Sequence, residues 1–302
     1  MDTPLIDPDE AVRRLLGAAP ALRRETVDVR CALGRTLAAP IVSPMALPPF
    51  DRAAMDGYAV RFEDPWPPLA VAGVARAGEP RLSLPPGAAI RIFTGAPLPH
   101  GADTVIEQEA CQVEEADRLR IRIRGFPGRN VMRRGHEMAP GTRVAAAGTR
   151  LTPYHLALVA AVGFGAVAVR KTPAVAILET GDELTEPGRP LAADHIYAAN
   201  GALIGALVRA WGGAVRIAAR VPDTRSAVTD ALLGAARRAD LVVVTGGVSV
   251  GDFDFVPAAL HAVGRRLFWG VSMHPGRATA AGLVEGTPVV ALSGNPGAAV
   301  VA

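Results

Sequence analysis

Apolar runs and helical patterns alternate along the second half of the chain. Five segments follow one another in this order: a continuous apolar run at 173–180, helical periodicity at 200–212, a strand pattern at 214–221, an amphipathic helix at 224–239 and a buried strand at 241–245. A last apolar run, residues 288–292, precedes a helical end. Such alternation predicts a doubly wound, mostly parallel sheet with right-handed crossovers over residues 171–302.

The pattern is different between residues 46 and 140. Short alternating runs are separated there by proline and glycine, which is typical of a small β-rich domain. The clearest run is RLRIRIRG at 118–125, in which arginines alternate with Leu and Ile. Because successive strand side chains point to opposite faces, we expect a solvated arginine face and an inward aliphatic face.

A helix is predicted near the N-terminus from the segment DPDEAVRRLLGAA, residues 7–19, and an extended segment follows at residues 25–34. Asp7 or Asp9 is placed to cap this helix. A second apolar segment, residues 152–169, is uncharged and long enough to suggest a membrane span. Gly163 and Gly165 divide it into a helix that stops and a short strand, so we interpret it as buried core.

The composition narrows the class of protein. A chain of 302 residues that is 50% hydrophobic can bury more than one core, which favours two or three domains and excludes a disordered chain. Its two cysteines, Cys31 and Cys111, are far apart, and the charged start does not resemble a signal peptide. These features indicate a reducing compartment and a cytoplasmic protein.

The charge argues against nucleic acid as a partner. The formal net charge is only +3, and the arginines are scattered, without the clusters and interleaved aromatic residues of a nucleic-acid surface. A mildly basic chain of this kind suits a small anionic ligand.

Three glycine-containing loops follow directly from predicted buried strands. They are TGDE at 180–183, TGGVSVGD at 245–252 and SGNP at 293–296. Because the carboxyl ends of parallel strands meet at one edge of a sheet, these loops should converge. Glycine amides bind anions, and the loops also carry acids, so a phosphorylated ligand with Mg²⁺ is favoured, although each loop alone also suits an ordinary tight turn.

Other motifs restrict the chemistry. The chain has no Walker loop, GxGxxG, CxxC or HExxH, which disfavours kinase, dinucleotide and zinc chemistry. The segment GVSVG at 247–251 matches the nucleophile elbow of serine hydrolases, with Ser249 as nucleophile and Asp254 and His261 or His274 downstream. Against this alternative, no HGGG-type segment precedes it, His261 lies in a helical pattern, and the other two loops have no role.

Seven segments carry a family resemblance. They read PPFDRAAMDGYAV, IFTGAPLPHGADTVIEQE, GRNVMRRGHEMAPGTRV, AILETGDEL, VVVTGGVSVGDFDFV, MHPGRATAAG and LSGNPGAA. In order and approximate spacing they resemble the molybdopterin molybdenumtransferase family, the MoeA-like proteins that include the gephyrin E domain. The resemblance runs from about residue 8 to the last residue.

The resemblance implies a multidomain α/β plus β fold and a reaction. A helical linker domain, residues 1–45 and 141–170, would carry an inserted β-rich domain, residues 46–140, followed by the molybdopterin-binding α/β domain. The implied reaction converts adenylylated molybdopterin and molybdate into molybdenum cofactor and AMP with Mg²⁺. A homodimer and contact with the adenylyltransferase that supplies the substrate are implied as partners. No membrane or nucleic acid is expected.

The resemblance also implies the site residues. Implied for catalysis are Asp56, Thr94, Glu183 and Asp254. Implied for Mg²⁺ are Asp56, Asp182, Glu183 and Asp254. Implied for molybdopterin and molybdate are Gly181, Asp182, Asp223, Gly246, Gly247, Ser249, His274, Arg277, Gly294 and Asn295. Asp51 is expected to fix its turn instead of reacting.

The chain departs from the family pattern at four places. HPGRA at 274–278 replaces Lys-Pro-Gly-Lys-Pro, GHE at 135–137 replaces Gly-Glu-Asp, AAN at 198–200 replaces Asp-Thr-Asn, and Ala53 replaces serine. A neutral imidazole at His274 is a poor counter-charge for molybdate. Tolerated drift, a weakened or binding-only paralogue that carries molybdopterin or acts as a scaffold, and a tungstate enzyme all stay open. The apolar last residues suggest a truncated chain without the family's C-terminal β-barrel.

Overall fold

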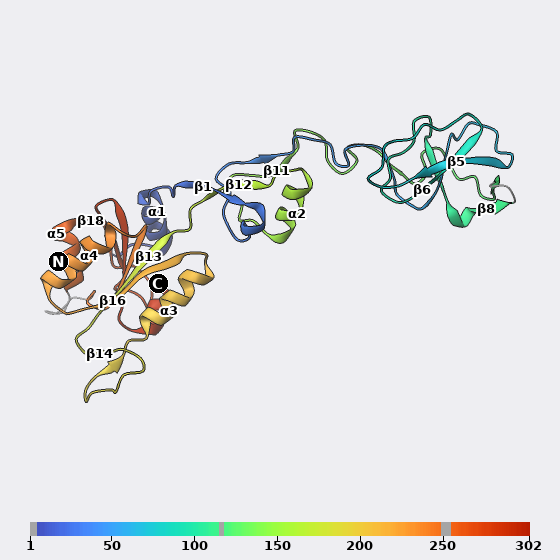
Figure 1. Ribbon diagram of the computed structural model, residues 1–302. Coiled ribbons are helices and arrows are strands. Elements are labelled where there is room, and N and C mark those ends of the chain that lie inside the picture. The colour runs from blue at the N-terminus through green and yellow to red at the C-terminus, as the bar shows by residue number, and fades with distance from the viewer. Residues whose placement is uncertain (1–4, 115–117, 249–254) are drawn as a thin grey trace. The chain divides into compact units, whose positions relative to one another are not determined.

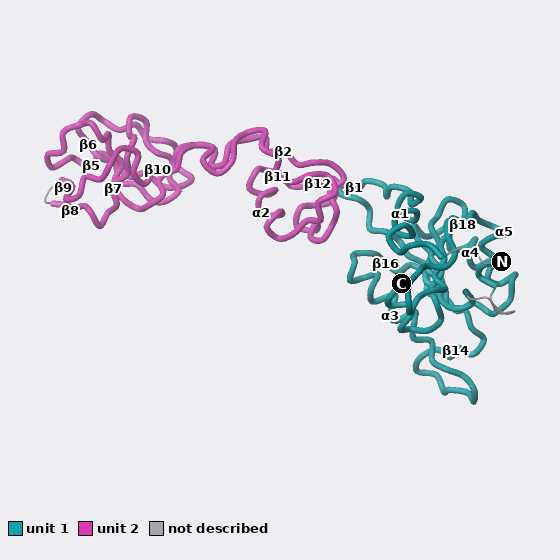
Figure 2. Tube along the Cα trace, turned by 180° about the vertical axis from the view of Figure 1, so that it is seen from behind, with its two compact units in different colours: residues 1–25, 169–302 teal, residues 26–168 magenta. Residues whose placement is uncertain are grey.

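The computed structural model describes residues 5–114, 118–248 and 255–302, and their contacts divide the chain into two compact units (Figure 1, Figure 2). Unit 1 contains residues 1–25 and 169–302, and unit 2 contains residues 26–168. Unit 2 is therefore an insertion between two segments of unit 1.

Unit 1 is built on a six-stranded sheet in the order β16-β13-β17-β20-β19-β18. Its strands are β13 (Ala174–Thr180), β16 (Ala214–Val221), β17 (Leu241–Thr245), β18 (Gly264–Trp269), β19 (Ala280–Val284) and β20 (Thr287–Leu292). Its helices are α1 (Pro8–Ala18), α3 (Asn200–Ala210), α4 (Arg225–Ala236), α5 (Phe255–Val263) and α6 (Pro296–Val301). The first four strands in this order are parallel, and β19 and β18 add an antiparallel edge. The predicted doubly wound, mostly parallel sheet is thus confirmed.

Helices cover both faces of this sheet because the apolar strands present side chains to each face in turn. Ala176 and Leu178 of β13 belong to a core that contains Leu232 of α4 and Leu260 of α5. The intervening Ile177 belongs to a second core, on the α3 and α6 face. A strand buried on both faces reads as a continuous apolar run, which explains why the sequence revealed β13 and β17 so clearly.

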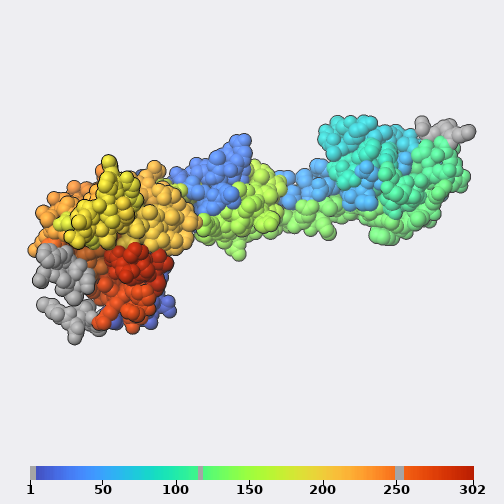
Figure 3. Space-filling view, turned by 90° about the horizontal axis from the view of Figure 1, so that it is seen from below, coloured from blue at the N-terminus to red at the C-terminus, as the bar shows by residue number. Residues whose placement is uncertain are grey.

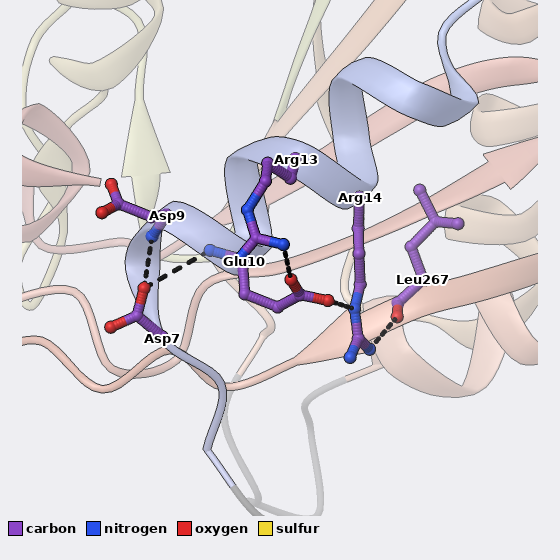
Figure 4. A network of polar contacts seen from close by, with 6 residues as sticks. All are labelled: Asp7, Asp9, Glu10, Arg13, Arg14 and Leu267. Atoms are coloured by element: carbon purple, nitrogen blue, oxygen red, sulfur yellow. Dashed lines mark hydrogen bonds and ion pairs between the residues drawn. The ribbon is translucent and has the colours of Figure 1, made fainter.

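Helix α1 begins at Pro8 behind the cap residue Asp7, whose carboxylate accepts the N–H groups of Asp9 and Glu10 (Figure 4). Of the two candidate caps, Asp7 is the one used. Arg14 ties the helix to β18 through a 3.4 Å hydrogen bond from Nη1 to the Leu267 carbonyl oxygen. Helix α1 therefore packs on the sheet of unit 1, against Phe268 and Ala281.

Unit 2 holds a six-stranded sheet in the order β7-β4-β6-β5-β9-β8. Its strands are β4 (Gly57–Val60), β5 (Leu69–Ala75), β6 (Ala88–Ile92), β7 (Thr104–Glu107), β8 (Cys111–Glu114) and β9 (Arg118–Ile121), with the short helix η2 (Gln108–Ala110) between β7 and β8. The remaining elements are η1 (Val29–Cys31), β2 (Ile41–Val42), β3 (Arg52–Ala53), β10 (Val131–Met132), β11 (Arg143–Ala145) and α2 (Pro153–Ala161). Two separate cores pack around the sheet, one containing Ile90 and Ile92 and the other Ile106 and Leu119.

The chain passes between the units through β1 (Arg24–Asp28) and β12 (Ala166–Arg170), which pair with each other. At one end of the pair Lys171 N donates to Arg23 O, and at the other Val29 N donates to Gly165 O. Between these two contacts the residue number rises from 23 to 29 along the first strand and falls from 171 to 165 along the second. The strands are therefore antiparallel.

The structure corrects two sequence predictions. Residues 152–169 do form a helix that stops and a strand, but helix α2 is not buried core: Val159 is buried, whereas Tyr154 is 82% exposed. The arginine strand at 118–125 ends at Ile121, and the expected inward side chain Ile123 is exposed. No helix of the described chain is both long and apolar enough to cross a membrane.

Candidate functional site

A cavity of about 570 Å³ lies in unit 1 at the carboxyl edge of the parallel strands. Its lining comes from the loops after β13, β17 and β20, from the start of α3, and from β14 (Leu184–Thr185) and β15 (Ile196–Tyr197). The lining residues include Glu179, Gly181, Glu183, Tyr197, Asn200, Asp223, Gly246, Gly247, Gly294 and Asn295. The three predicted loops therefore do converge. Strand β16 lies on one side of β13 and β17 on the other, which is the switch point where open α/β sheets bind ligands.

Glycine at position 246 allows two of these loops to touch. Gly246 has φ +85°, and a Cβ there would lie 2.4 Å from the carbonyl oxygen of Thr180, at the end of β13. Its N–H donates to Leu292 O over 3.1 Å, so this amide joins the loops after β17 and β20 and is not directed at a ligand. Among the described residues, no acceptor takes the N–H of Gly181 or Gly294, and these amides are better placed to bind an anion.

The acids of the TGDE loop have different surroundings. Asp182 and Asp223 exchange hydrogen bonds: Asp223 N donates to Asp182 Oδ1 over 3.2 Å, and Asp182 N donates to Asp223 Oδ2 over 3.3 Å. Asp182 is not part of the cavity lining, whereas Asp223 and Glu183 are. The Glu183 carboxylate lies against Gly181, since a Cβ on that glycine would be 2.6 Å from Glu183 Oε2. Of the two acids of the TGDE loop, Glu183 is therefore the one that lines the cavity, together with the predicted Asp223 from the loop after β16.

Two polar residues of this cavity were missed by the sequence analysis. Glu179 Oε1 accepts the N–H of Gly201 over 2.7 Å, and Asn200, only 7% exposed, donates from Nδ2 to Gly294 O over 2.9 Å. The signal for Glu179 was present: it is a charged residue inside an otherwise apolar strand run. For Asn200, the signal was that it is the one residue of the family's Asp-Thr-Asn motif that AAN at 198–200 keeps.

The described lining contains no lysine, arginine or histidine. His274 and Arg277 are exposed in the loop between β18 and β19, and from that loop Ala278 alone lines the cavity. The expected basic contact to molybdate through these two side chains stays a prediction. Asn295 lines the cavity, but its Oδ1 caps α6 by accepting the N–H groups of Gly297 and Ala298.

The described acids do not form a ready-made metal site. Within residues 5–114, 118–248 and 255–302, no three His, Cys, Asp or Glu side chains gather closely enough to hold an ion. Asp254, which was predicted for metal binding, lies outside these residues, as do Ser249 and Asp252. The serine-hydrolase alternative thus keeps its nucleophile and its acid outside the described chain, while His261 is exposed on α5.

The second group of predicted site residues belongs to unit 2. Asp56 Oδ1 accepts the hydroxyl of Thr94 over 2.7 Å and its backbone N–H over 2.8 Å, so the MDG corner and the TGAP loop are joined. These two bonds, with the positive charge of Arg91, hold the pKa of Asp56 below its ordinary value. The sequence analysis missed Arg91, whose guanidinium lies 4.9 Å from the Tyr58 ring centroid and 5.0 Å from that of Phe93.

Asp51 has a structural position. Its Oδ1 accepts Arg134 N over 2.7 Å and its Oδ2 accepts Arg133 Nη1 over 2.8 Å. Burial raises the pKa of Asp51, but these donors outweigh burial and the net shift is downward. The carboxylate fixes its own loop to residues 133–134, as expected.

Three of the departures from the family pattern have a local structural account. Ala53 is fully buried in a core of unit 2, and Ala198 is buried in unit 1, so small apolar side chains suit both positions. Glu137 pairs with Arg52 at 3.3 Å. Ala53, Ala198 and Glu137 do not line the cavity, whereas Ala199 of the AAN segment does.

Comparisons with known proteins give a consistent result. The family described as "MoeA N-terminal region (domain I and II)" matches residues 6–163, and "Probable molybdopterin binding domain" matches residues 176–302. A molybdopterin molybdenumtransferase from Haemophilus influenzae is 37% identical over 97% of this chain and 74% of its own length. Molybdopterin molybdenumtransferase 2 from Mycobacterium tuberculosis is 39% identical over 93% of this chain and 73% of its own length.

Solved structures agree. Two crystal structures of the molybdopterin biosynthesis MoeA protein from Pyrococcus horikoshii match with TM-scores of 0.86 and 0.81 at 32% identity. Each match covers 98% of this chain and 76% of the other. The chain spans about three quarters of the length of these relatives.

Proposed function

The chain belongs to the molybdopterin molybdenumtransferase family, and we propose that it inserts molybdate into adenylylated molybdopterin and releases AMP during molybdenum cofactor biosynthesis. One observation carries the proposal for this chain. The TGDE, TGG and SGN loops meet around one cavity at the carboxyl edge of the parallel sheet. Family membership supports the substrates, since the curated relatives are named for this transfer.

The described residues suggest a division of work. We assign the amides of Gly181 and Gly294 to oxygen atoms of the phosphorylated substrate, because backbone N–H groups hold anions without a full positive charge. We assign Glu183 to orienting the substrate, since it lines the cavity and its carboxylate lies beside the Gly181 backbone. Asp56 and Thr94 remain proposed reacting residues, supported by the hydrogen bonds that preorganise them.

Mg²⁺ is proposed as a companion of the substrate. Magnesium keeps several waters and is commonly held by one or two carboxylates together with substrate phosphates, so it does not require a cage of protein ligands. Glu183 is the described acid that suits this arrangement best, and Mg²⁺ would neutralise phosphate charge there. Equilibrium dialysis with Mg²⁺ and AMP, comparing the native chain with Glu183→Gln, measures this contribution without the reaction.

Activity is tested by incubating the full chain with adenylylated molybdopterin, Mg²⁺ and molybdate and quantifying AMP. Removing a group that takes part in the reaction typically costs 10²-fold or more, so Asp56→Ala and Glu183→Ala should each lower the rate by about 10²-fold. Matched controls are Glu79→Ala in unit 2 and Glu186→Ala in unit 1, both from exposed ion pairs. AMP release that is unchanged in Asp56→Ala or Glu183→Ala removes that residue from the mechanism.

The same assay separates the other candidates. Tight pterin binding without AMP identifies a carrier or scaffold, and a preference for tungstate over molybdate identifies a tungsten enzyme. If His274→Lys releases AMP faster than the native chain, the histidine at this position is a tolerated substitution of the family's lysine. We further propose that the protein is a cytoplasmic homodimer, and measurement of its size in solution tests the dimer. We also propose that it receives its substrate from the adenylyltransferase, and a pull-down with that enzyme tests this contact.

A further inference from the structure

Glu179 is a cavity residue that the proposed mechanism does not use. It lies near the end of β13, and its Oε1 accepts the N–H of Gly201 in the first turn of α3. This contact replaces a conventional cap, since the residue before the helix is Ala199, which has no side-chain acceptor. Gly201 permits the approach, because a Cβ there would lie 2.2 Å from Glu179 Oε2.

The cap uses only part of the hydrogen-bonding capacity of this carboxylate. A carboxylate offers about four acceptor positions on its two oxygens, and one is filled by Gly201 N. No arginine, lysine or histidine of the described chain pairs with Glu179. Free acceptor positions in a partly buried cavity favour a ligand that brings N–H donors.

The negative charge of the cavity lining also favours a ligand that brings N–H donors. Glu179, Glu183 and Asp223 are its charged residues, and none of the described lining residues is cationic. A phosphate placed beside Glu179 would be repelled, whereas a neutral ring with several N–H groups would be attracted. Asn200 adds a buried Oδ1 that accepts no hydrogen bond from any described residue.

An apolar wall completes the cavity. Strands β14 and β15, in yellow on the surface of unit 1 in Figure 3, contribute Leu184, Ile196 and Tyr197. The Tyr197 hydroxyl donates to Arg189 O over 3.1 Å, and Arg220 Nη1 donates to Leu184 O over 2.6 Å. Both contacts tie down the segment that carries the ring. A half-exposed aromatic ring held in this way is suited to stacking against a flat heterocycle.

We propose that Glu179 and Tyr197 recognise the 2-amino-4-oxopyrimidine edge of a pterin ring in this cavity. The carboxylate accepts the N–H groups of the 2-amino substituent and of N3, and the ring stacks on Tyr197. Guanine presents the same pair of donors, whereas adenine does not. The inference rests on the proposed function and deepens it, because it assigns the Glu179 and Tyr197 part of this cavity to the pterin ring, while the amides of Gly181 and Gly294 stay assigned to phosphate oxygens.

The experiment measures binding of simple probes to the full chain, namely 6-hydroxymethylpterin, guanosine and adenosine, by calorimetry. The native chain should bind the pterin and guanosine more tightly than adenosine. Glu179→Gln keeps an oxygen that can accept the Gly201 N–H but loses the charged acceptor pair. Because hydrogen bonds to charged groups are stronger than neutral ones, affinity for the pterin should fall about ten- to a hundredfold.

Tyr197 is tested in the same way. Tyr197→Ala should weaken pterin binding about tenfold or more, and Tyr197→Phe, which keeps the ring, should weaken it far less. Glu186→Gln, an exposed glutamate on the same segment and outside the lining, is the matched control and should bind as the native chain does. The melting temperature of Glu179→Gln is recorded to separate capping from recognition.

Several outcomes overturn the inference. It fails if Glu179→Gln binds the pterin like the native chain, if adenosine binds more tightly than both other probes, or if Glu179→Gln lowers the melting temperature and weakens all three probes equally. The proposed function fails separately. Pterin binding that depends on Glu179, without AMP release, supports the inference and contradicts the transferase activity. AMP release and pterin affinity that are both unchanged in Glu179→Gln support the transferase activity and contradict the inference.

Discussion

Gly246 shows how a single residue determines whether the cavity can form. Its backbone has positive φ, and the atom that a Cβ would meet is a backbone carbonyl oxygen, which cannot rotate away. Gly246→Ala should therefore destabilise the chain by about 2 kcal/mol or more, measured as the free energy of unfolding in urea.

The matched control for this substitution is Gly234→Ala. Gly234 lies within α4, and a Cβ there would meet nothing within 4 Å. Because alanine is a better helix former than glycine, this variant should be more stable by about 0.5–1 kcal/mol. Equal stability of the two glycine variants would show that the close approach of Gly246 to the Thr180 carbonyl oxygen does not constrain the fold.

The Asp56–Thr94 pair makes a pH-dependent prediction. The pKa of Asp56 is lowered from its ordinary value of 3.8, so the pair stabilises the folded state above that value, and this stabilisation is lost as the pH falls through the lower folded pKa. Thr94→Val removes the hydroxyl donor and should raise the pKa of Asp56 toward 3.8. An NMR titration of the Asp56 carboxyl measures both values, and an unchanged pKa in Thr94→Val would show that the hydroxyl is not the main cause.

At the residue scale, the sequence predicted the loops better than their roles. Gly181, Glu183 and Gly294 were found because glycines and acids that follow buried strands must gather at one sheet edge. Two roles depend on contacts between segments far apart in sequence: the Gly246 amide donates to Leu292 O, and Glu179 caps α3. Arg91 was missed for the same reason, since its partner Tyr58 lies on another strand, although its other partner, Phe93, is only two residues away.

At the scale of elements, helices α4 and α2 differ in what they bury. Leu232 of α4 is fully buried between helix and sheet, whereas Leu158 of α2 is 39% exposed. Leu232→Ala should cost about 2–5 kcal/mol because it leaves a cavity, and Leu158→Ala should cost about 1 kcal/mol or less. Urea denaturation of both variants measures the difference, and equal losses would contradict the burial assigned to the two helices.

The same comparison explains which elements could be predicted. Strands β13 and β17 are covered on both faces, so their apolar runs identify them. Helix α2 carries apolar residues around its whole circumference, and composition alone does not tell a buried helix of this kind from an exposed one. The antiparallel edge was missed because β18 contains two arginines and β19 is short and rich in alanine and glycine.

At the scale of the whole chain, the order of segments explains why the sequence did not predict which unit contains helix α1. Unit 1 is discontinuous: its N-terminal helix α1 precedes the insertion, residues 26–168, and the strands β18 and β19 on which it packs lie far beyond it, at residues 264–284. Local periodicity predicts that a helix exists, but it contains no information about a partner more than two hundred residues away. The assignment of α1 to the α/β unit therefore required coordinates.

The antiparallel pairing of β1 and β12 has a consequence for how unit 2 is connected to unit 1. The chain leaves the α/β unit along one strand and returns along its immediate neighbour, and Arg23 and Lys171 are already hydrogen-bonded partners. A tight turn of two to five residues is long enough to join two such neighbours. The whole of unit 2 is thus inserted at the tip of a hairpin-like strand pair, and the six-stranded sheet of unit 1 is not interrupted by it.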